Sequence, residues 1–149
     1  MFKRILLLVD STESSGAAAD RAIALAAQCK AELLALAVID TATLKELLTY
    51  RIMVQQEMEE YEKELELSGK RQLALVEEQA RKVGVKCRSI HMKGAVHSVV
   101  LAQQESVGAD LIVLSAFRAS QVSRDLLAKE KQFIVDDAKN AVIIVKKGS

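Results

Sequence analysis

Continuous runs of apolar residues constrain the fold of this chain more than any other feature of its sequence. The chain contains RILLLVD near its start, then AELLALAVID and DLIVLS, and AVIIVKK near its end. None of these runs alternates apolar and polar residues, as a strand with one face in water would. Each run is therefore predicted to be a strand covered on both faces, which is usual in a parallel sheet.

The segments between these strands carry apolar residues at helical spacing. Helices are predicted from about 12 to 30, over 97–107 and over 121–139, and Leu126 and Phe133 are expected to face inward in the last of these. The alternating segment VKCRSIHMK is predicted to be a further strand. Strands that alternate with helices indicate one parallel sheet with helices on both faces.

We therefore expect a single α/β domain over residues 1–149, with a five-stranded, doubly wound, Rossmann-like sheet. The segment 41–83 is too long for a single helix on base rates, so we expect two helices with a break at Ser68-Gly69. The first of them should protrude past the core. Gly84 should end the second, because glycine tolerates the left-handed conformation after a helix.

Composition excludes several classes of partner. The formal net charge is +1 and only 3% of the residues are aromatic, with no basic stripe, so nucleic acid is not an expected partner. The first apolar run is too short to cross a membrane or to form a signal-peptide core. Cys29 and Cys87 form no CxxC motif and are interpreted as reduced thiols of a cytoplasmic protein, with a single disulfide as the alternative.

Doubly wound sheets bind ligands at the carboxyl ends of their strands. The segments that form these strands and the loops after them resemble the universal stress protein family. The resemblance rests on RILLLVDSTESS, AELLALAVID, GADLIVLSAFRAS and NAVIIVKK. It covers the chain in order, apart from the variable segment 42–70. The resemblance implies a stress-response protein with the fold of the adenine nucleotide alpha hydrolases, and the family has nucleotide-binding and non-binding branches.

The phosphate loop of the binding branch is replaced in this chain. That branch carries three glycines at fixed spacing, which let backbone amides approach the phosphates, followed by a hydroxyl residue. A gap-free alignment places Ser115, Arg118 and Ala128 on the glycines and Lys129 on the hydroxyl residue, with Glu130 next. The resemblance therefore implies the non-nucleotide-binding branch, with no cofactor.

The adenosine side of the family's site is better preserved. Asp10 and Val38 are present, and Leu114 stands where the binding branch has methionine. The alternative is thus an adenine-nucleotide module that binds ATP with Mg²⁺, or AMP, through a modified loop. These residues do not distinguish the nucleotide-binding branch from the non-binding one, because Val38 and Leu114 would be core residues in either branch and Asp10 could cap the following helix.

Two further interpretations of polar residues stay open. Arg118 and Lys129 could hold an anion with their side chains, but Asp125 lies one helical turn before Lys129, which favours an ion pair on a solvated helix face. The hydroxyl cluster could accept phosphate, although helix capping is favoured because such residues lead the capping preferences; its members are Ser11, Thr12, Ser14 and Ser15.

No enzyme is expected. A nucleophilic serine needs a base and an orienting acid, and no acid is spaced to form an evident triad with His91 or His97. Alternation places Cys87 and His91 on one strand face, but no fourth ligand is apparent, so no metal site is predicted.

The last apolar run is predicted to form a dimer contact. An apolar edge strand invites pairing, and in the family the last strand commonly pairs with its copy in a second subunit. A homodimer is therefore expected through Val142, Ile143, Ile144 and Val145, with a covered internal strand as the alternative. The protruding segment 42–70 is the expected contact for a protein partner.

Overall fold

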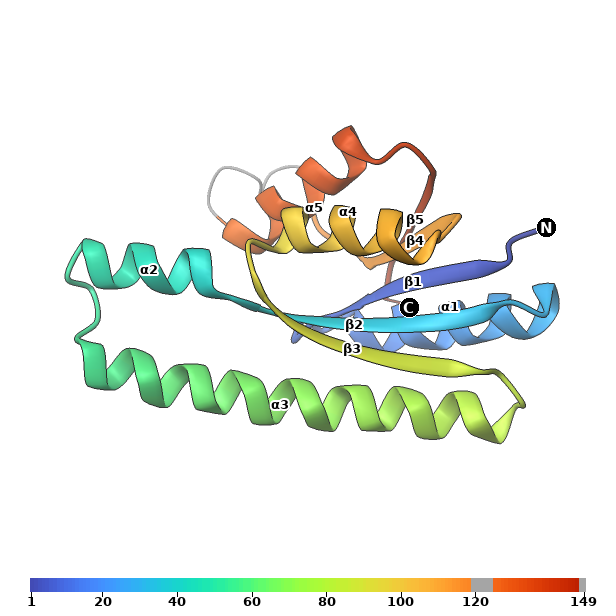
Figure 1. The fold of residues 1–149 in the computed structure, drawn as a ribbon, viewed down its shortest axis with the longest axis horizontal. Helices are drawn as coiled ribbons and strands as arrows, with labels where there is room; N and C mark the ends of the chain where they lie inside the picture. The colour runs from blue at the N-terminus through green and yellow to red at the C-terminus, as the bar shows by residue number, and fades with distance from the viewer. Residues whose placement is uncertain (119–124, 148–149) are drawn as a thin grey trace.

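Five parallel strands form one sheet in the order β3-β2-β1-β4-β5 (Figure 1). This computed structural model describes residues 1–118 and 125–147. The order reverses direction between β1 and β4, which makes the carboxyl ends of these two strands the switch point of the sheet. The strands are β1 (Arg4–Val9), β2 (Glu32–Asp40), β3 (Cys87–Gly94), β4 (Leu111–Ser115) and β5 (Ala141–Val145).

Helices cover both faces of the sheet, as predicted. On one face lie α1 (Ser15–Cys29) and α3 (Gln55–Lys82), and on the other α4 (Val96–Val107) and α5 (Leu126–Asp137) (Figure 1). The remaining helix, α2 (Thr41–Thr49), projects beyond the carboxyl ends of the strands together with the start of α3. The predicted doubly wound α/β fold is confirmed.

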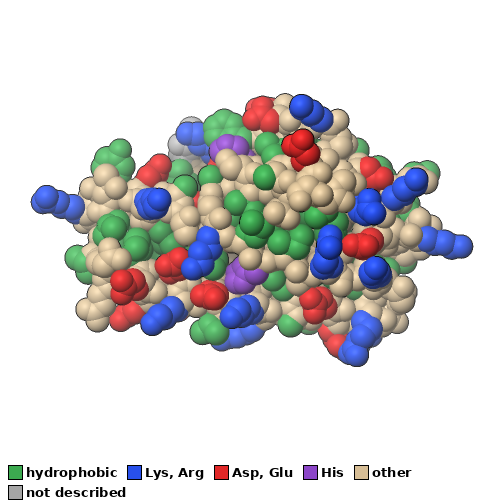
Figure 2. Space-filling model, viewed as in Figure 1, with side chains coloured by type: hydrophobic (Ala, Val, Ile, Leu, Met, Phe, Trp, Pro, Cys, Tyr) green, Lys and Arg blue, Asp and Glu red, His purple; other side chains and the backbone are tan. Residues whose placement is uncertain are grey.

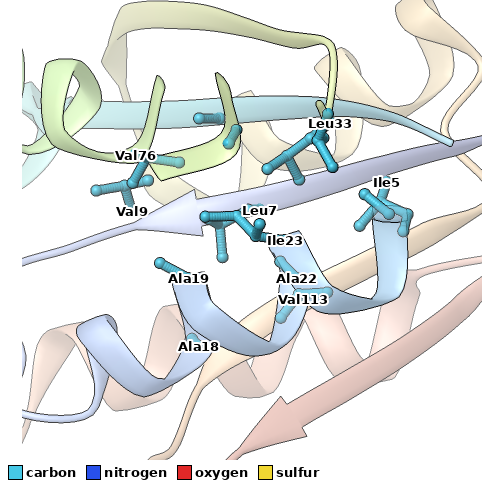
Figure 3. Close-up of a cluster of buried hydrophobic side chains, with 14 of the residues drawn as sticks. Ile5, Leu7, Val9, Ala18, Ala19, Ala22, Ile23, Leu33, Val76 and Val113 are labelled. Carbon is cyan, nitrogen blue, oxygen red and sulfur yellow. The ribbon is translucent and has the colours of Figure 1, made fainter. Parts of the chain in front are cut away.

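Each face of the sheet has its own hydrophobic core. Alternate residues of β1 point to opposite faces, so Ile5 and Leu7 pack towards α1 while Leu6 and Leu8 pack towards α4 and α5. Figure 3 shows the first cluster, in which the small residues of α1 approach the sheet closely beside Val76 of α3. These residues are Ala18, Ala19 and Ala22.

The predicted helix break at Ser68-Gly69 is wrong, because both residues lie inside α3 and the chain turns at residues 50–54 instead. Gly69 is buried where α3 crosses the sheet. A Cβ added there would lie 2.8 Å from His91 Nε2 and 3.6 Å from the Cβ of Ala37. The glycine therefore serves close packing of the helix, not chain reversal.

The last helix also differs from its prediction. It begins at Leu126, and the predicted residues 121–124 lie outside the described part of the chain. Leu126 and Phe133, expected to face inward, are 48% and 37% exposed. The centre of the Phe133 ring lies 5.0 Å from that of the His97 ring in α4. By contrast, Gly84 follows α3 at φ +73°, as predicted.

Candidate functional site

A buried ion pair occupies the switch point of the sheet. Asp10 follows β1, Ser115 ends β4, and Lys131 reaches them from α5. Lys131 Nζ lies 2.9 Å from Asp10 Oδ2 and donates a hydrogen bond to Ser115 Oγ at 2.6 Å. Ser115 Oγ in turn donates to Asp10 Oδ2 at 2.7 Å. Residues distant in sequence thus form one closed network, completed by Thr12, whose backbone amide donates to Asp10 Oδ1 at 2.9 Å.

The network is almost entirely removed from water. The side chains of Lys131 and Asp10 are 1% and 8% exposed, and Ser115 is fully buried. Burial by itself would raise the pKa of Asp10, but the charge of Lys131 and hydrogen bonds from Thr12, Lys131 and Ser115 outweigh it and hold that pKa below its ordinary value. Asp10 is therefore a carboxylate whose charge is balanced within the protein.

Lys131 is the residue that the sequence analysis missed. The buried positions of α5 include Ala128, Lys131 and Ile134, which recur at helical spacing. A lysine in the middle of an inward-facing stripe is unusual, because lysine is almost never fully buried unless it is paired. That position was a readable signal for an internal ion pair with a carboxylate at a strand end.

A second carboxylate occupies the N-terminus of α5. Asp125 is its N-cap, and its Oδ1 accepts hydrogen bonds from the amides of Leu127 and Ala128 at 3.0 and 3.4 Å. These are amides that a bound phosphate would otherwise use. The predicted pairing of Asp125 with Lys129 is therefore replaced by capping, and Lys129 Nζ lies 5.9 Å from the centre of the Phe133 ring.

The other residues aligned with the phosphate loop are dispersed. Ser115 and Ala128 are buried. Arg118 is exposed at the wall of an open cavity of about 920 Å³, which Lys131, Lys146 and Lys147 also line. Glu130 contacts His97 Nδ1 and so links α5 to α4. The structure thus separates Arg118, Lys129 and Glu130 instead of directing them at one point.

The hydroxyl cluster after β1 does not cap α1 as expected. The N-cap of α1 is Ser14, which makes no side-chain capping hydrogen bond. Thr12 Oγ1 bonds to Asp10 and lies 2.9 Å from Ser115 Oγ, and Ser15 Oγ accepts from the Asp10 amide at 3.3 Å. Asp10 likewise organises its own loop instead of capping the helix.

On the adenosine side, Asp10 and Val38 line one cavity of about 290 Å³ that also contacts α2 and α3. Leu114 is fully buried in the core under α4 and α5. The structure therefore brings together two of the three adenosine-side residues, and the third acts as a packing residue.

β5 lies at the edge of the sheet, as predicted. Ile144 is 41% exposed there, whereas its neighbours Val142, Ile143 and Val145 are half-buried. A strand at this position has one unpaired side. The homodimer through β5 stays a prediction.

Cys29 and Cys87 are both free thiols. Burial, with the nearby charge of Glu77, raises the pKa of the Cys87 thiol to about 11, although a backbone hydrogen bond at Ala35 acts in the opposite sense. Within residues 1–118 and 125–147, no group of three or more His, Cys, Asp or Glu side chains could hold a metal ion. No helix in those ranges is both long enough and apolar enough to cross a membrane.

The strand order defines a doubly wound α/β protein whose switch point lies at the carboxyl ends of β1 and β4. A model of the universal stress protein family matches residues 1–146, and the chain therefore belongs to the universal stress protein family.

Solved structures agree with this fold. Hypothetical protein MJ0577 is 22% identical with a TM-score of 0.77, over 100% of this chain and 99% of that one. The universal stress protein UspA from Lactobacillus plantarum is 21% identical, with a TM-score of 0.75 over 96% and 97% of the two chains. A universal stress protein in complex with cAMP is 21% identical, with a TM-score of 0.67 over 97% and 96%. No curated protein matches the chain significantly.

Proposed function

We propose that this universal stress protein works in the cytoplasm as a non-enzymatic homodimer that acts through protein contacts, without binding ATP. The observation that carries the proposal is the Asp10–Lys131 pair at the switch point. A phosphate needs a free cation or free amides. Lys131 is instead neutralised by Asp10, and the Asp125 carboxylate already bonds to the first amides of α5.

Calorimetry with ATP and Mg²⁺ on the purified protein tests this proposal. We expect no binding in the micromolar range and no absorbance at 260 nm from nucleotide carried through purification. Micromolar affinity for ATP would contradict the proposal.

A rebuilt phosphate loop makes the test sharper. The variant R118G/A128G/K129S restores two of the three glycines and the hydroxyl of the binding branch while it keeps Ser115 and Lys131. Because Lys131 is still neutralised by Asp10, we expect no gain in ATP affinity from that variant. We expect a gain of at least about tenfold, the effect of one charged contact, when Asp10→Asn is added and leaves the Lys131 ammonium without its counter-charge. Equal ATP affinity of the two variants would show that Lys131 is irrelevant to nucleotide exclusion. Circular dichroism checks that both variants fold.

Adenine-nucleotide binding through a modified loop is the second candidate. Asp10 and Val38 line a common cavity at the strand ends, and a solved relative is described as a complex with cAMP. The same calorimetry with AMP and cAMP separates the two candidate functions. The second predicts binding of these nucleotides at micromolar concentrations, and the first predicts none.

The proposed dimer rests on the unpaired side of β5. Isologous pairing would give each edge strand a partner and cover Ile144. Ile144→Lys should give a monomer in sedimentation velocity. Leu75→Lys, at a 59% exposed position of α3, is the matched control and should leave the dimer intact. A dimer that persists in Ile144→Lys contradicts this interface.

The proposed protein contact is the projecting part of segment 42–70. Its turn between α2 and α3 exposes Tyr50, Ile52 and Val54 at 74%, 67% and 60%. Figure 2 shows hydrophobic side chains among charged ones over this end of the molecule. An apolar projection of this kind suits a protein partner better than a polyanion.

The absence of an enzyme activity is also part of the proposal. The structure does bring Glu130 to His97, and Ser98 Oγ lies 3.5 Å from His97 Nε2. Ser98 is nevertheless an exposed helix residue adjacent to its would-be base, and side chains at successive helix positions do not face each other. We therefore assign the His97–Glu130 contact to the packing of α4 against α5.

A further inference from the structure

The turn between α2 and α3 lies at the tip of the projection in Figure 1. Among residues 1–118 and 125–147, Tyr50, Ile52 and Val54 are the most exposed large apolar side chains apart from Met1. The backbone that carries them is folded onto α2, because the amides of residues 50–53 all donate to carbonyls of that helix, at 2.9–3.2 Å. The three side chains are therefore held outwards by a hydrogen-bonded turn, which is typical of a binding surface.

The same hydrogen bonds limit how a partner can bind at the turn. Since the amides of residues 50–53 are already used within the protein, a partner cannot add a strand there through main-chain hydrogen bonds. Recognition must come from side chains. An amphipathic helix meets this requirement, because its apolar residues recur on one face and its polar residues flank them.

The first half of α3 continues from the turn with a row of carboxylates. Glu57, Glu60 and Glu64 are spaced three and four residues apart, so they lie on one face of the helix, and all three are exposed. Within the described part of the chain, ion pairs from this segment join Glu62 to Lys93 and Glu66 to Lys70, but none joins the row to a cation. The row is therefore available to a positively charged partner.

Charge along this segment favours such a partner. Residues 45–66 carry seven acidic and three basic side chains, a net charge of −4, whereas the whole chain carries +1. Like charges three or four residues apart destabilise a helix, so Glu60 is repelled by both Glu57 and Glu64. Cations of a partner would relieve this repulsion, while an anionic surface would be repelled by the segment.

We propose that residues 45–66, the acidic hairpin, dock a basic amphipathic helix of a partner protein. Its apolar face would cover Tyr50, Ile52 and Val54, and its Lys or Arg side chains would face the glutamate row. The chain rises about 15 Å from Val54 to Glu64, so a partner helix of about three turns spans both parts of the surface. The inference rests on the protein contact in the proposed function and adds the chemistry of the partner.

Fluorescence anisotropy with two labelled peptides tests the inference. The probe LKKLLKLLKKLLKL forms a helix with leucines on one face and lysines on the other, and LEELLELLEELLEL keeps the apolar face but reverses the charge. At about 100 mM salt we expect the basic probe to bind the wild-type protein with a dissociation constant below about 100 μM. The acidic probe should bind at least about tenfold more weakly, because like charges oppose its approach.

A triple variant isolates the glutamate row. E57Q/E60Q/E64Q should weaken the basic probe about fivefold to tenfold, because each exposed ion pair contributes little by itself.

D20N/E105Q/D137N is the matched control, since it removes the same charge from exposed helix positions outside the hairpin. Its affinity for the basic probe should stay within about twofold of the wild type, because salt screens charges more than about 10 Å apart.

A second variant isolates the apolar tip. Ile52→Ser should weaken the basic probe at least about fivefold, because an isoleucine side chain no longer becomes buried on binding. Leu75→Ser is its control, at a 59% exposed position in the second half of α3, and should leave binding unchanged. Circular dichroism checks that all variants fold.

Three results would overturn the basic partner while the proposed protein contact stands, provided that Ile52→Ser still weakens binding. They are equal affinity for the two probes, binding of the acidic probe alone, and equal effects of the two triple variants. Unchanged binding in Ile52→Ser, or no binding of either probe at about 100 μM, would count against the contact itself. If Ile52→Ser sediments as a smaller species than the wild type, a second copy covers the tip and the inference fails.

Discussion

Replacing Lys131 by methionine should destabilise this protein more than any surface substitution. Methionine keeps most of the aliphatic length but leaves the Asp10 carboxylate buried without its counter-charge. The side chains of the pair are 1% and 8% exposed, so solvent screening is slight. Removal of one partner from a buried ion pair costs about 3–5 kcal/mol in free energy of unfolding. Lys129→Met, on the exposed side of α5, should cost less than about 0.5 kcal/mol.

The effect of Lys131→Met should depend on pH in a defined direction. In the wild type the pKa of Asp10 lies below its ordinary 3.8, so its contribution to stability is present above that value and is lost as the pH falls through the lower folded-state pKa. Without Lys131, burial dominates and raises the pKa of Asp10. Protonation then relieves the buried charge at low pH, and the stability gap between variant and wild type should narrow from pH 7 to pH 4.

Urea unfolding followed by circular dichroism measures both effects. The protein concentration must be fixed, because association would change apparent stability. Adding Asp10→Asn to Lys131→Met should recover part of the loss, because no net charge then remains buried. A loss below about 1 kcal/mol at pH 7, or a loss that is the same at pH 4, would refute the assignment of a stabilising buried pair.

Two further predictions concern Gly69 and Cys87. Gly69→Ala should lower the free energy of unfolding despite the better helix propensity of alanine, because the added Cβ would meet the His91 ring. Gly16→Ala in α1 should raise the free energy of unfolding by up to about 1 kcal/mol, because no atom lies within 4 Å of the added Cβ. Urea unfolding of the two variants decides this, and a gain of stability in both would contradict the packing role of Gly69. Because the pKa of the Cys87 thiol is raised to about 11, only about a thousandth of the Cys87 side chains carry a thiolate at pH 8. In a Cys29→Ser background, Cys87 should therefore react with a disulfide reagent at least about tenfold more slowly than in urea, and equal rates would speak against its burial.

The sequence was a good guide to the sheet and a poorer guide to α3. Continuous apolar runs such as that at Ile5–Val9 are covered on both faces, and this pattern depends only on local residue order. Gly69 was misread because a glycine that breaks a helix and a glycine that admits a neighbouring ring look the same in one dimension. The His91 ring that distinguishes them comes from β3, which follows α3 in the chain.

The candidate site shows the same division. Asp10 was singled out because it matches the adenosine side of the family's site, but its partner Lys131 was passed over although it interrupts an inward stripe. Recognising the pair required knowing that β1, β4 and the start of α5 converge. Arg118 and Lys129 stood out in the sequence as cations in a phosphate loop, yet the turn of α5 sends Lys129 outward, beside Phe133.

By itself, the sequence determined the α/β class, the parallel sheet and the absence of glycine from residues 109–147, because strand burial and glycine content are local properties. Only the tertiary structure decided which side chains meet at the switch point of the sheet. A closed pair of Asp10 and Lys131 forms because sheet order places residues from the two ends of the chain at one switch point. Tertiary structure also leaves His91 Nε2 without a hydrogen-bond partner among residues 1–118 and 125–147, where the ring lies against Gly69 of α3.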